Sequence, residues 1–127
     1  MPVASPQEGL QALFAAFNKG DIDALVALYE PGASMVAQPG QVATGTEGVR
    51  EVMAGFLAMK PTLTSEKNET ITAGDLALSV TKWTLKGTDP NGQPIGLEGT
   101  ATDVLRKQVD GSWLFVIDNP WGDGIVG

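Results

Sequence analysis

Hydrophobic residues in the first part of the chain recur every three or four positions, which is the spacing of one face of an α-helix. The series begins after Ser5, which can cap a helix, and Glu8 completes a capping box three residues later. Pro6 suits the first helical turn, and Gly20 ends the pattern. The sequence therefore predicts a first helix whose buried stripe consists of Leu10, Leu13, Phe14 and Phe17.

Two further helices are predicted in the first half of the chain. Asp21 can cap a short second helix that ends before the next proline. Thr46 is expected to cap a third helix over residues 47–60, which a following proline prevents from continuing. Between these helices, residues 33–40 form a short strand or extended segment that leads into a glycine-containing loop.

From residue 62 onward the pattern changes to β-permissive segments separated by turn residues, which indicates strands. Turns are predicted at Gly74-Asp75, Asn91-Gly92 and Asp110-Gly111. The predicted strands cover residues 62–72, 76–86, 97–107 and 113 to about 121. Helices followed by strands predict a single α+β domain over residues 1–127, with the helices packed on one face of an antiparallel sheet.

One carboxylate interrupts the apolar face of the third long strand. If residues 97–107 alternate regularly, Asp103 lies on the same face as Ala101 and Leu105. Burial would raise the pKa of this carboxyl, so that it could stay protonated and donate a hydrogen bond, or act as an acid or base. A structural interpretation is also open, in which Asp103 only accepts hydrogen bonds from neighbouring hydroxyl or backbone groups. The surroundings of Asp103 therefore decide whether the chain has a candidate active site.

Charge limits the class of partner. The 127 residues include 15 acidic and 8 basic ones, which gives a net charge of −7 that would repel nucleic-acid phosphates and anionic lipid surfaces. No apolar run is long enough to span a bilayer, and the first residues do not resemble a signal peptide. We therefore expect a cytoplasmic protein with neither a nucleic-acid nor a membrane partner.

Two residue types that the sequence lacks narrow the chemistry. The chain has no cysteine and no histidine, which removes thiol nucleophiles, zinc–thiolate sites and the commonest general base. Any enzyme of this sequence must therefore use carboxylates, with lysines and Tyr29 as the other groups available for acid–base work. We expect no metal ion and no cofactor.

Three segments of the chain resemble a known superfamily. "FNKGDIDALVALYEPGA", "GTEGVREVM" and "TDVLRKQVDGSWLFVIDNPWG" are similar to the NTF2-like superfamily, and most closely to its SnoaL-like and ketosteroid isomerase-like members, including the DUF4440 branch. The resemblance runs from about Leu10 to Gly122. It implies an NTF2-like (cystatin-like) cone, in which a strongly curved antiparallel sheet wraps around the N-terminal helices and a pocket opens at the wide end. Members of the superfamily usually form dimers.

The resemblance also indicates which functional positions of the isomerases are kept. The isomerases use a tyrosine on the first helix, an aspartate base after the second helix and a protonated aspartate on a late strand. These positions correspond here to Leu13, Gln38 and Asp103. Because Gln38 cannot accept a proton from carbon at neutral pH, we do not expect the steroid isomerase mechanism itself.

The last predicted strand carries a second candidate acid. Both faces of this strand are largely apolar, so alternation alone does not decide which face lies inside. The family resemblance favours an inward position for Val116 and Asp118 beside Asp103, where the two carboxyls would share a proton. Alternatively, the Asp118 side chain caps the turn over residues 118–122.

The remaining candidate ligand contacts are aromatic, flexible or amide side chains. Trp83 and Trp121 each offer a flat apolar face with one hydrogen-bond donor, and Gln38 could orient a carbonyl or a water. Trp113 is expected instead to cover the outer sheet face, where a dimer would form. Asn119 is a further candidate for orienting a ligand. The other candidates, which more often serve a core alone, are Tyr29, Phe17, Phe56 and Met59.

These features are compatible with two main functions, and with a third, weaker option in which a water held by an aspartate hydrolyses a strained ring such as an epoxide. The first is binding of a small, largely apolar, oxygen-bearing molecule in a cone-shaped pocket, with isomerase-, cyclase- or dehydratase-type acid–base chemistry at Asp103 if the protein is an enzyme. The alternative is a non-catalytic homodimeric module that binds a ligand or takes part in assembly. We expect a homodimer in either case, because the outer strand faces carry Thr, Val and Trp with few charges.

Overall fold

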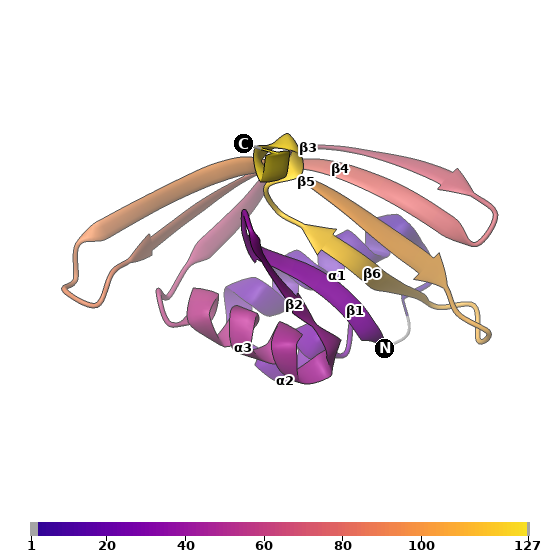
Figure 1. Cartoon of the computed structure of the whole chain (residues 1–127), viewed down its shortest axis with the longest axis horizontal. Helices are drawn as coiled ribbons and strands as arrows, with labels where there is room; N and C mark the ends of the chain where they lie inside the picture. Colours follow the sequence, from indigo (N-terminus) through magenta and orange to yellow (C-terminus); the bar gives the residue numbers. More distant parts are fainter. Residues whose placement is uncertain (1–2, 127) are drawn as a thin grey trace.

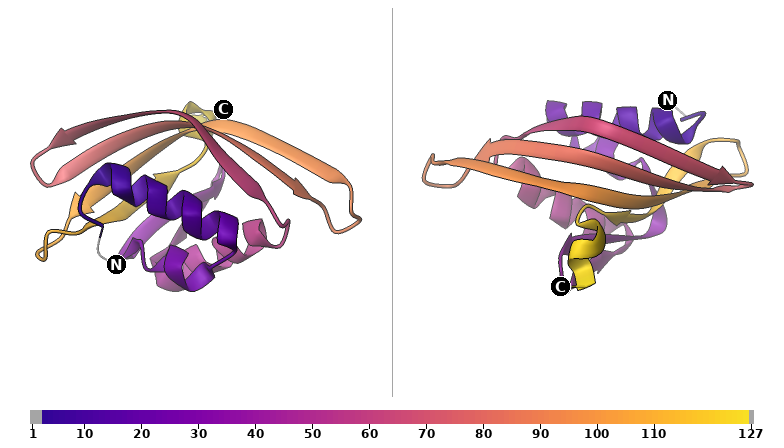
Figure 2. Two further views of the ribbon diagram at one scale, coloured as in Figure 1. Left: turned by 180° about the vertical axis from the view of Figure 1, so that it is seen from behind. Right: turned by 90° about the horizontal axis from the view of Figure 1, so that it is seen from above.

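The computed structural model describes residues 3–126. A strongly bent sheet arches over the α-helices, which lie on its concave side (Figure 1). The views in Figure 2 show α1 running across this concave side, beneath the long strands. The helices are α1 (Pro6–Lys19), α2 (Ile22–Val26) and α3 (Gly45–Leu57), and a short 3-10 helix, η1 (Gly122–Val126), follows the last strand. None of these helices is long and apolar enough to cross a lipid bilayer.

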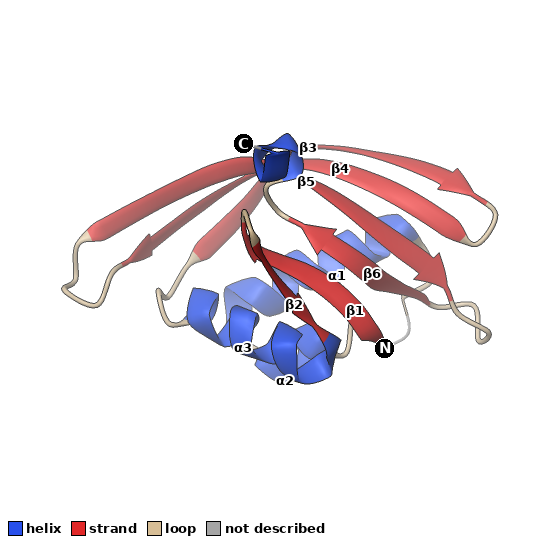
Figure 3. Ribbon diagram, viewed as in Figure 1, coloured by secondary structure: helices blue, strands red, loops and turns tan. Residues whose placement is uncertain are grey.

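The sheet contains six strands in the order β2-β1-β6-β5-β4-β3 (Figure 3). Their bounds are β1 (Tyr29–Gln38), β2 (Gln41–Thr44), β3 (Thr62–Ala73), β4 (Leu76–Thr88), β5 (Pro94–Lys107) and β6 (Trp113–Asn119). Neighbouring strands are antiparallel except β1 and β6, which are parallel. This exception arises because α3 carries the chain from one edge of the sheet to the other. The predicted α+β cone is confirmed, with a sheet that is mixed at this one pairing.

The helix starts show one confirmed prediction and one correction. Ser5 Oγ accepts a hydrogen bond from the Glu8 backbone N–H at 3.2 Å, while Glu8 Oε2 accepts one from the Ala4 N–H at 2.9 Å, so the capping box forms. Helix α3 begins at Gly45 with Thr44 at the N-cap, and the prediction of a cap two residues later was wrong. Gly45 has a φ of 84°, a conformation open to glycine that lets the chain turn directly from β2 into α3.

Regular alternation along β4 and β5 defines the inner face of the sheet. Asp103 is 2% exposed and lies between two buried apolar neighbours of the same face, so its predicted inward orientation is confirmed. The buried residues of this inner face are Ala77, Ser79, Thr81, Trp83 and Leu85 on β4, and Ala101, Asp103 and Leu105 on β5.

A β-bulge in β6 changes which of its residues face the core. The extra residue is Val116, because the register between β5 and β6 shifts at this point. Before the bulge Trp113 and Phe115 are buried, and after it Asp118 is buried while Ile117 is 43% exposed. The prediction that Trp113 covers the outer face was therefore wrong, and Val116, expected to face inward, is only half-buried.

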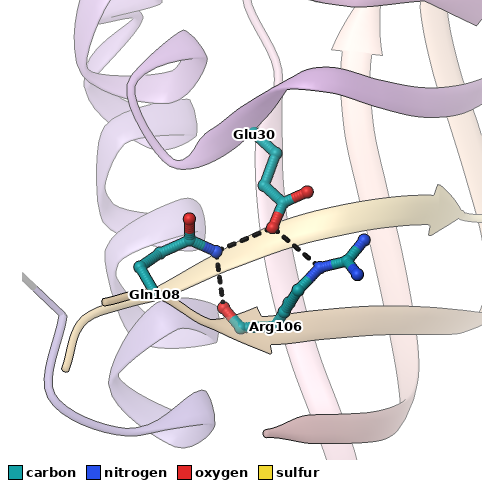
Figure 4. Close-up of polar contacts among 3 residues, drawn as sticks. All are labelled: Glu30, Arg106 and Gln108. Carbon is teal, nitrogen blue, oxygen red and sulfur yellow. Dashed lines mark hydrogen bonds and ion pairs between the residues drawn. The ribbon is translucent and has the colours of Figure 1, made fainter. Parts of the chain in front are cut away.

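A polar cluster ties two strands that are not neighbours (Figure 4). Glu30 Oε2 on β1 accepts from Arg106 Nε on β5 at 2.9 Å and from Gln108 Nε2 at 2.7 Å. Strand β6 lies between β1 and β5 in the sheet, so this contact bridges it. Because the Arg106 side chain is 49% exposed, we expect the ion pair to contribute only about 0.5 kcal/mol to stability.

Candidate functional site

Asp103 and Asp118 lie side by side at the centre of the inner face. They are direct cross-strand partners on β5 and β6, and they are 2% and 4% exposed. Ser79 is the partner of Asp103 on β4, and Met35 is the partner of Asp118 on β1. A row of inward side chains thus crosses four strands. In the part of the chain that the structure describes, no third acidic side chain joins the two acids to make a group that could hold a metal ion.

Each acid has a hydrogen-bond donor that fixes its position. The backbone N–H of Asn119 donates to Asp103 Oδ1 at 3.0 Å. The phenol of Tyr29, at the start of β1, donates to Asp118 Oδ2. Tyr29 is itself buried, with its ring centroid 5.3 Å from that of Phe115. Both donors, the Asn119 N–H and the Tyr29 hydroxyl, lie in the buried interior, so they hold the two acids in place.

The turn after β6 is capped by Asn119 rather than by Asp118. Asn119 Oδ1 accepts from the Trp121 backbone N–H at 3.3 Å, and Asn119 Nδ2 donates to Thr102 Oγ1 and to the Gly122 carbonyl. The Asp118 carboxyl instead receives the Tyr29 hydroxyl. The interpretation of Asp118 as the turn cap was therefore wrong.

The two acids are placed to share one proton. Burial raises the pKa of Asp103 well above its usual range, and the neighbouring Asp118 carboxylate raises it further. Burial also raises the pKa of Asp118, but hydrogen bonds from Tyr29 and Asp103 partly oppose this. Burial and the Asp118 charge keep the pKa of Tyr29 well above its ordinary value, so the phenol remains a donor. We assign the shared proton to Asp103, which donates to an ionised Asp118.

A cavity of about 70 Å³ lies between the sheet and the helices, and both acids form part of its wall. The rest of this wall is almost entirely apolar, so a bound molecule would meet hydrocarbon and aromatic groups everywhere except at the acids and at Thr81. Side chains from the sheet and from two helices meet here. The aromatic and flexible parts of the wall come from Phe14, Phe17, Phe56, Trp83, Met35 and Met53.

Trp83 forms the cavity wall beside Pro120, and Trp121 packs behind it. Trp83 Nε1 donates to the Pro120 carbonyl at 2.8 Å, and the Trp121 ring packs edge-on against Trp83 with centroids 5.7 Å apart. A Cβ at position Gly99 would lie 2.9 Å from Trp83 Cζ2 and 3.1 Å from the Pro120 oxygen, so only glycine lets the indole lie this close to β5. Trp121 donates to the carbonyls of β1 and lies behind Trp83.

The structure separates the predicted site residues into two groups. Asp103, Asp118, Trp83, Phe17 and Phe56 line the cavity. The others do not line it: Tyr29 supports Asp118, Asn119 caps the turn, Trp121 backs Trp83, Met59 is half-buried elsewhere, and Gln38 is exposed near the β1–β2 turn.

Several lining residues were not predicted as ligand contacts. Thr81 shares its strand face with Trp83, so the alternation that placed Trp83 inside could have identified it. Phe14 belonged to the predicted stripe of the first helix. Met53 shares the predicted apolar face of the third helix with Phe56, so the same spacing could have identified it. Met35 carried no such signal, because its contact with the cavity depends on how α3 packs against β1.

Residues 10–116 match the protein family described as SnoaL-like domain. The chain belongs to the SnoaL-like family. The resemblance predicted from the sequence is thereby confirmed. No functionally curated protein is significantly similar to this SnoaL-like domain in sequence.

Solved structures of similar fold come from several bacteria. An NTF2-like superfamily protein from Salmonella enterica superposes with a TM-score of 0.79 at 20% identity, covering 88% of this chain and 84% of that protein. A proposed ketosteroid isomerase from Shewanella frigidimarina gives 0.76 at 23% identity, covering 87% and 89%. A proposed dehydratase of the NTF2-like family from Streptomyces avermitilis gives 0.74 at 22% identity, covering 87% and 88%. At these identities the likeness shows the fold alone.

The cavity of this SnoaL-like domain offers one acid–base unit. The titratable groups in its wall are Asp103 and Asp118. Leu13, which corresponds to the isomerase tyrosine, contributes an apolar side chain to the wall, and Gln38 is remote from it. Proton transfer in the cavity would therefore involve the paired acids on β5 and β6.

Proposed function

We propose that this SnoaL-like domain binds a small, neutral, largely apolar molecule that carries a carbonyl or hydroxyl oxygen, and transfers a proton to or from it. The observation that carries the proposal is the pair of buried, directly opposed acids, Asp103 and Asp118, in the wall of an otherwise apolar cavity, where burial raises the pKa of Asp103. An uncharged oxygen suits the site, because an anion would face an ionised Asp118 and a chain of net charge −7.

The arrangement allows the proton of Asp103 to be redirected to a ligand. With the shared proton assigned to Asp103, this carboxyl donates to Asp118 in the free protein, and Asp118 also accepts from Tyr29. If the Asp103 proton turns toward a ligand oxygen, Asp118 keeps the Tyr29 hydrogen bond and stays ionised. Tyr29 is therefore a positioning residue in this proposal, and Asp118 is available as the base.

A simple ketone would undergo enolisation at such a pair. Asp118 would take a proton from the carbon next to the carbonyl, the C–H electrons would form the C=C bond, and Asp103 would give its proton to the carbonyl oxygen. The reverse steps return the ketone. This is the proton-transfer half of isomerase-, cyclase- and dehydratase-type reactions, for which general acid–base groups contribute about 10²–10⁴-fold.

Binding and proton transfer can be tested separately with acetophenone. Calorimetry is expected to show that Asp103→Ala binds acetophenone about 5–10-fold more weakly than the wild-type protein, because one hydrogen bond is lost. Ethylbenzene has a similar shape but no oxygen, and it is expected to bind both proteins equally. Equal effects on both compounds would contradict contact between Asp103 and the oxygen.

Exchange of the acetophenone methyl protons in D₂O, followed by NMR, tests the chemistry. The wild-type protein is expected to speed exchange, and Asp103→Asn, which keeps a hydrogen-bond donor but cannot give up a proton, is expected to lower that rate at least about 100-fold. Binding without accelerated exchange would favour the alternative of a non-catalytic ligand-binding module.

We further propose that two copies of the chain pair through the outer face of the sheet. Ile71, Leu78, Val104 and Ile117 are successive cross-strand partners on β3 to β6 and form an apolar row. Ile71, Leu78 and Ile117 are 65%, 40% and 43% exposed. In a two-fold symmetric dimer, a second copy would cover this row with the same residues.

Leu78→Glu is expected to convert the dimer to a monomer, because the new carboxylates would face each other near the two-fold axis. Light scattering at tens of micromolar protein measures the change. Val109→Glu is the matched control, since Val109 is an exposed apolar residue in the turn after β5 and outside the row. A wild-type protein that is already monomeric would contradict this proposal.

A further inference from the structure

An open groove of about 550 Å³ runs between α1 and β3. It contains no charged side chain: its polar wall consists of amides and hydroxyls. The amides come from Gln7, Gln11, Asn18 and Asn68, and the hydroxyls come from Thr62, Thr64 and Ser65. Because the chain has a net charge of −7, a groove lined by neutral side chains differs from the rest of the surface in its charge.

This groove adjoins the apolar cavity. Leu10, Phe14 and Leu63 line both spaces, so the groove and the cavity share part of their walls. Phe14 and Leu63 are half-buried, and rotation of two such side chains would join the groove to the cavity. The cavity alone, at about 70 Å³, is well below the roughly 300–1,000 Å³ of ordinary small-molecule sites. A ligand of ordinary size must therefore extend beyond it.

Hydrogen bonds hold the groove in a defined shape. Asn18 Nδ2 donates to the Leu63 carbonyl at 3.0 Å, and the Leu63 N–H donates to Asn18 Oδ1 at 2.7 Å, so one side chain of α1 is bonded to the backbone of the edge strand β3. Because both partners are fixed, the distance between the two walls at this end of the groove is set by the fold.

A polar link also connects the groove to the cavity. Asn68 Nδ2 donates to Thr81 Oγ1 at 2.8 Å and to Ser79 Oγ at 2.9 Å. Thr81 is 2% exposed and lines the cavity. Since its bond to Asn68 uses the hydroxyl as an acceptor, the hydroxyl hydrogen of Thr81 is available to a ligand oxygen. The boundary between groove and cavity is thus the place where a ligand would change from apolar to polar.

We propose that the α1–β3 groove binds the neutral, hydroxylated or carbonyl-bearing part of the same ligand whose apolar part occupies the cavity. This inference rests on the proposed function, because it concerns the same ligand. The ligand class is an uncharged molecule whose largely apolar end carries the oxygen that meets Asp103 and whose other end carries hydroxyl or further carbonyl groups. A carboxylate or phosphate at the polar end would find no cation in the groove wall.

The test uses three related compounds and calorimetry on the full chain. The compounds are acetophenone, acetophenone with a para-linked glycerol ether, and acetophenone with a para-linked carboxymethyl ether. The glycerol ether is expected to bind the wild-type protein about tenfold more tightly than acetophenone, as two neutral hydrogen bonds would give. The carboxymethyl ether is expected to show no such gain.

Gln11→Trp fills the groove from the exposed side of α1, and Lys19→Trp adds the same side chain on α1 outside the groove lining. Gln11→Trp is expected to remove the tenfold gain and leave acetophenone binding unchanged, whereas Lys19→Trp retains the gain. Equal affinities of the wild-type protein for acetophenone and the glycerol ether would overturn the groove assignment, as would equal behaviour of the two tryptophan variants. If acetophenone itself fails to bind, the proposed function is overturned instead.

Discussion

The free energy of unfolding of the wild-type domain is expected to increase as the pH falls from 7 to 5. Burial raises the pKa of Asp103 well above its ordinary value of 3.8, so in this range the folded chain holds a proton that the unfolded chain releases. A group with a raised folded-state pKa stabilises the protein fully at low pH and loses that contribution as the pH rises. One such proton changes the free energy of unfolding by about 1.4 kcal/mol per pH unit.

Urea unfolding at a series of pH values measures this slope. Asp103→Asn is the control, because the amide carries no titratable proton and is expected to flatten most of the profile. Asp110 affects the pH dependence of stability in the opposite direction, because hydrogen bonds from Ser112 lower its pKa. The stability that it contributes is lost only below its ordinary pKa, which lies outside the range from pH 5 to 7. A wild-type profile that is flat or rises with pH between 5 and 7 would show that Asp103 is ionised in the folded state.

Asp118→Asn is expected to lower the free energy of unfolding at pH 7 by about 2–4 kcal/mol, because a buried acceptor of two hydrogen bonds is replaced. Asp118 accepts from Tyr29 and from Asp103, and an amide at this position would direct an N–H at one of these donors. Asp103→Asn is expected to change stability by less than about 1 kcal/mol, since an amide can both donate to Asp118 and accept from the Asn119 N–H.

The contrast between these two variants assigns the proton. Denaturation curves measure the stability of both variants. Tyr29→Phe serves as a third variant, because it removes one hydrogen-bond donor from Asp118. Equal losses for the two asparagine variants, or a larger loss for Asp103→Asn, would mean that the shared proton lies on Asp118 instead.

The sequence predicted the position of Asp103 because β5 alternates without interruption between buried and exposed residues. The same reasoning could not show which residues of β6 face the core, because the bulge at Val116 exchanges the two faces halfway along the strand. It therefore placed Trp113 outside, and it left Asp118 open between the core and a turn cap. A bulge arises from the register with neighbouring strands and has no signature in the strand's own pattern.

Gln38 illustrates a second limit. Its alignment with the isomerase base placed it at the pocket, but the β1–β2 register shifts between Val36 and Gln38, and the Gln38 side chain is exposed. The size of the cavity and the groove beside it also escaped prediction, because both depend on how closely α1 packs against β3. Such distances are set by tertiary packing, which hydrophobic periodicity does not encode.

The protonation state of Asp103 at neutral pH is the central claim, and carbon-13 NMR of the aspartate side-chain carboxyls tests it most directly. The account predicts one carboxyl resonance that keeps the chemical shift of a protonated acid at pH 7 and is missing from the Asp103→Asn spectrum. If every aspartate resonance titrates with a midpoint near 4, Asp103 is an ordinary carboxylate and the proposed acid–base site is contradicted.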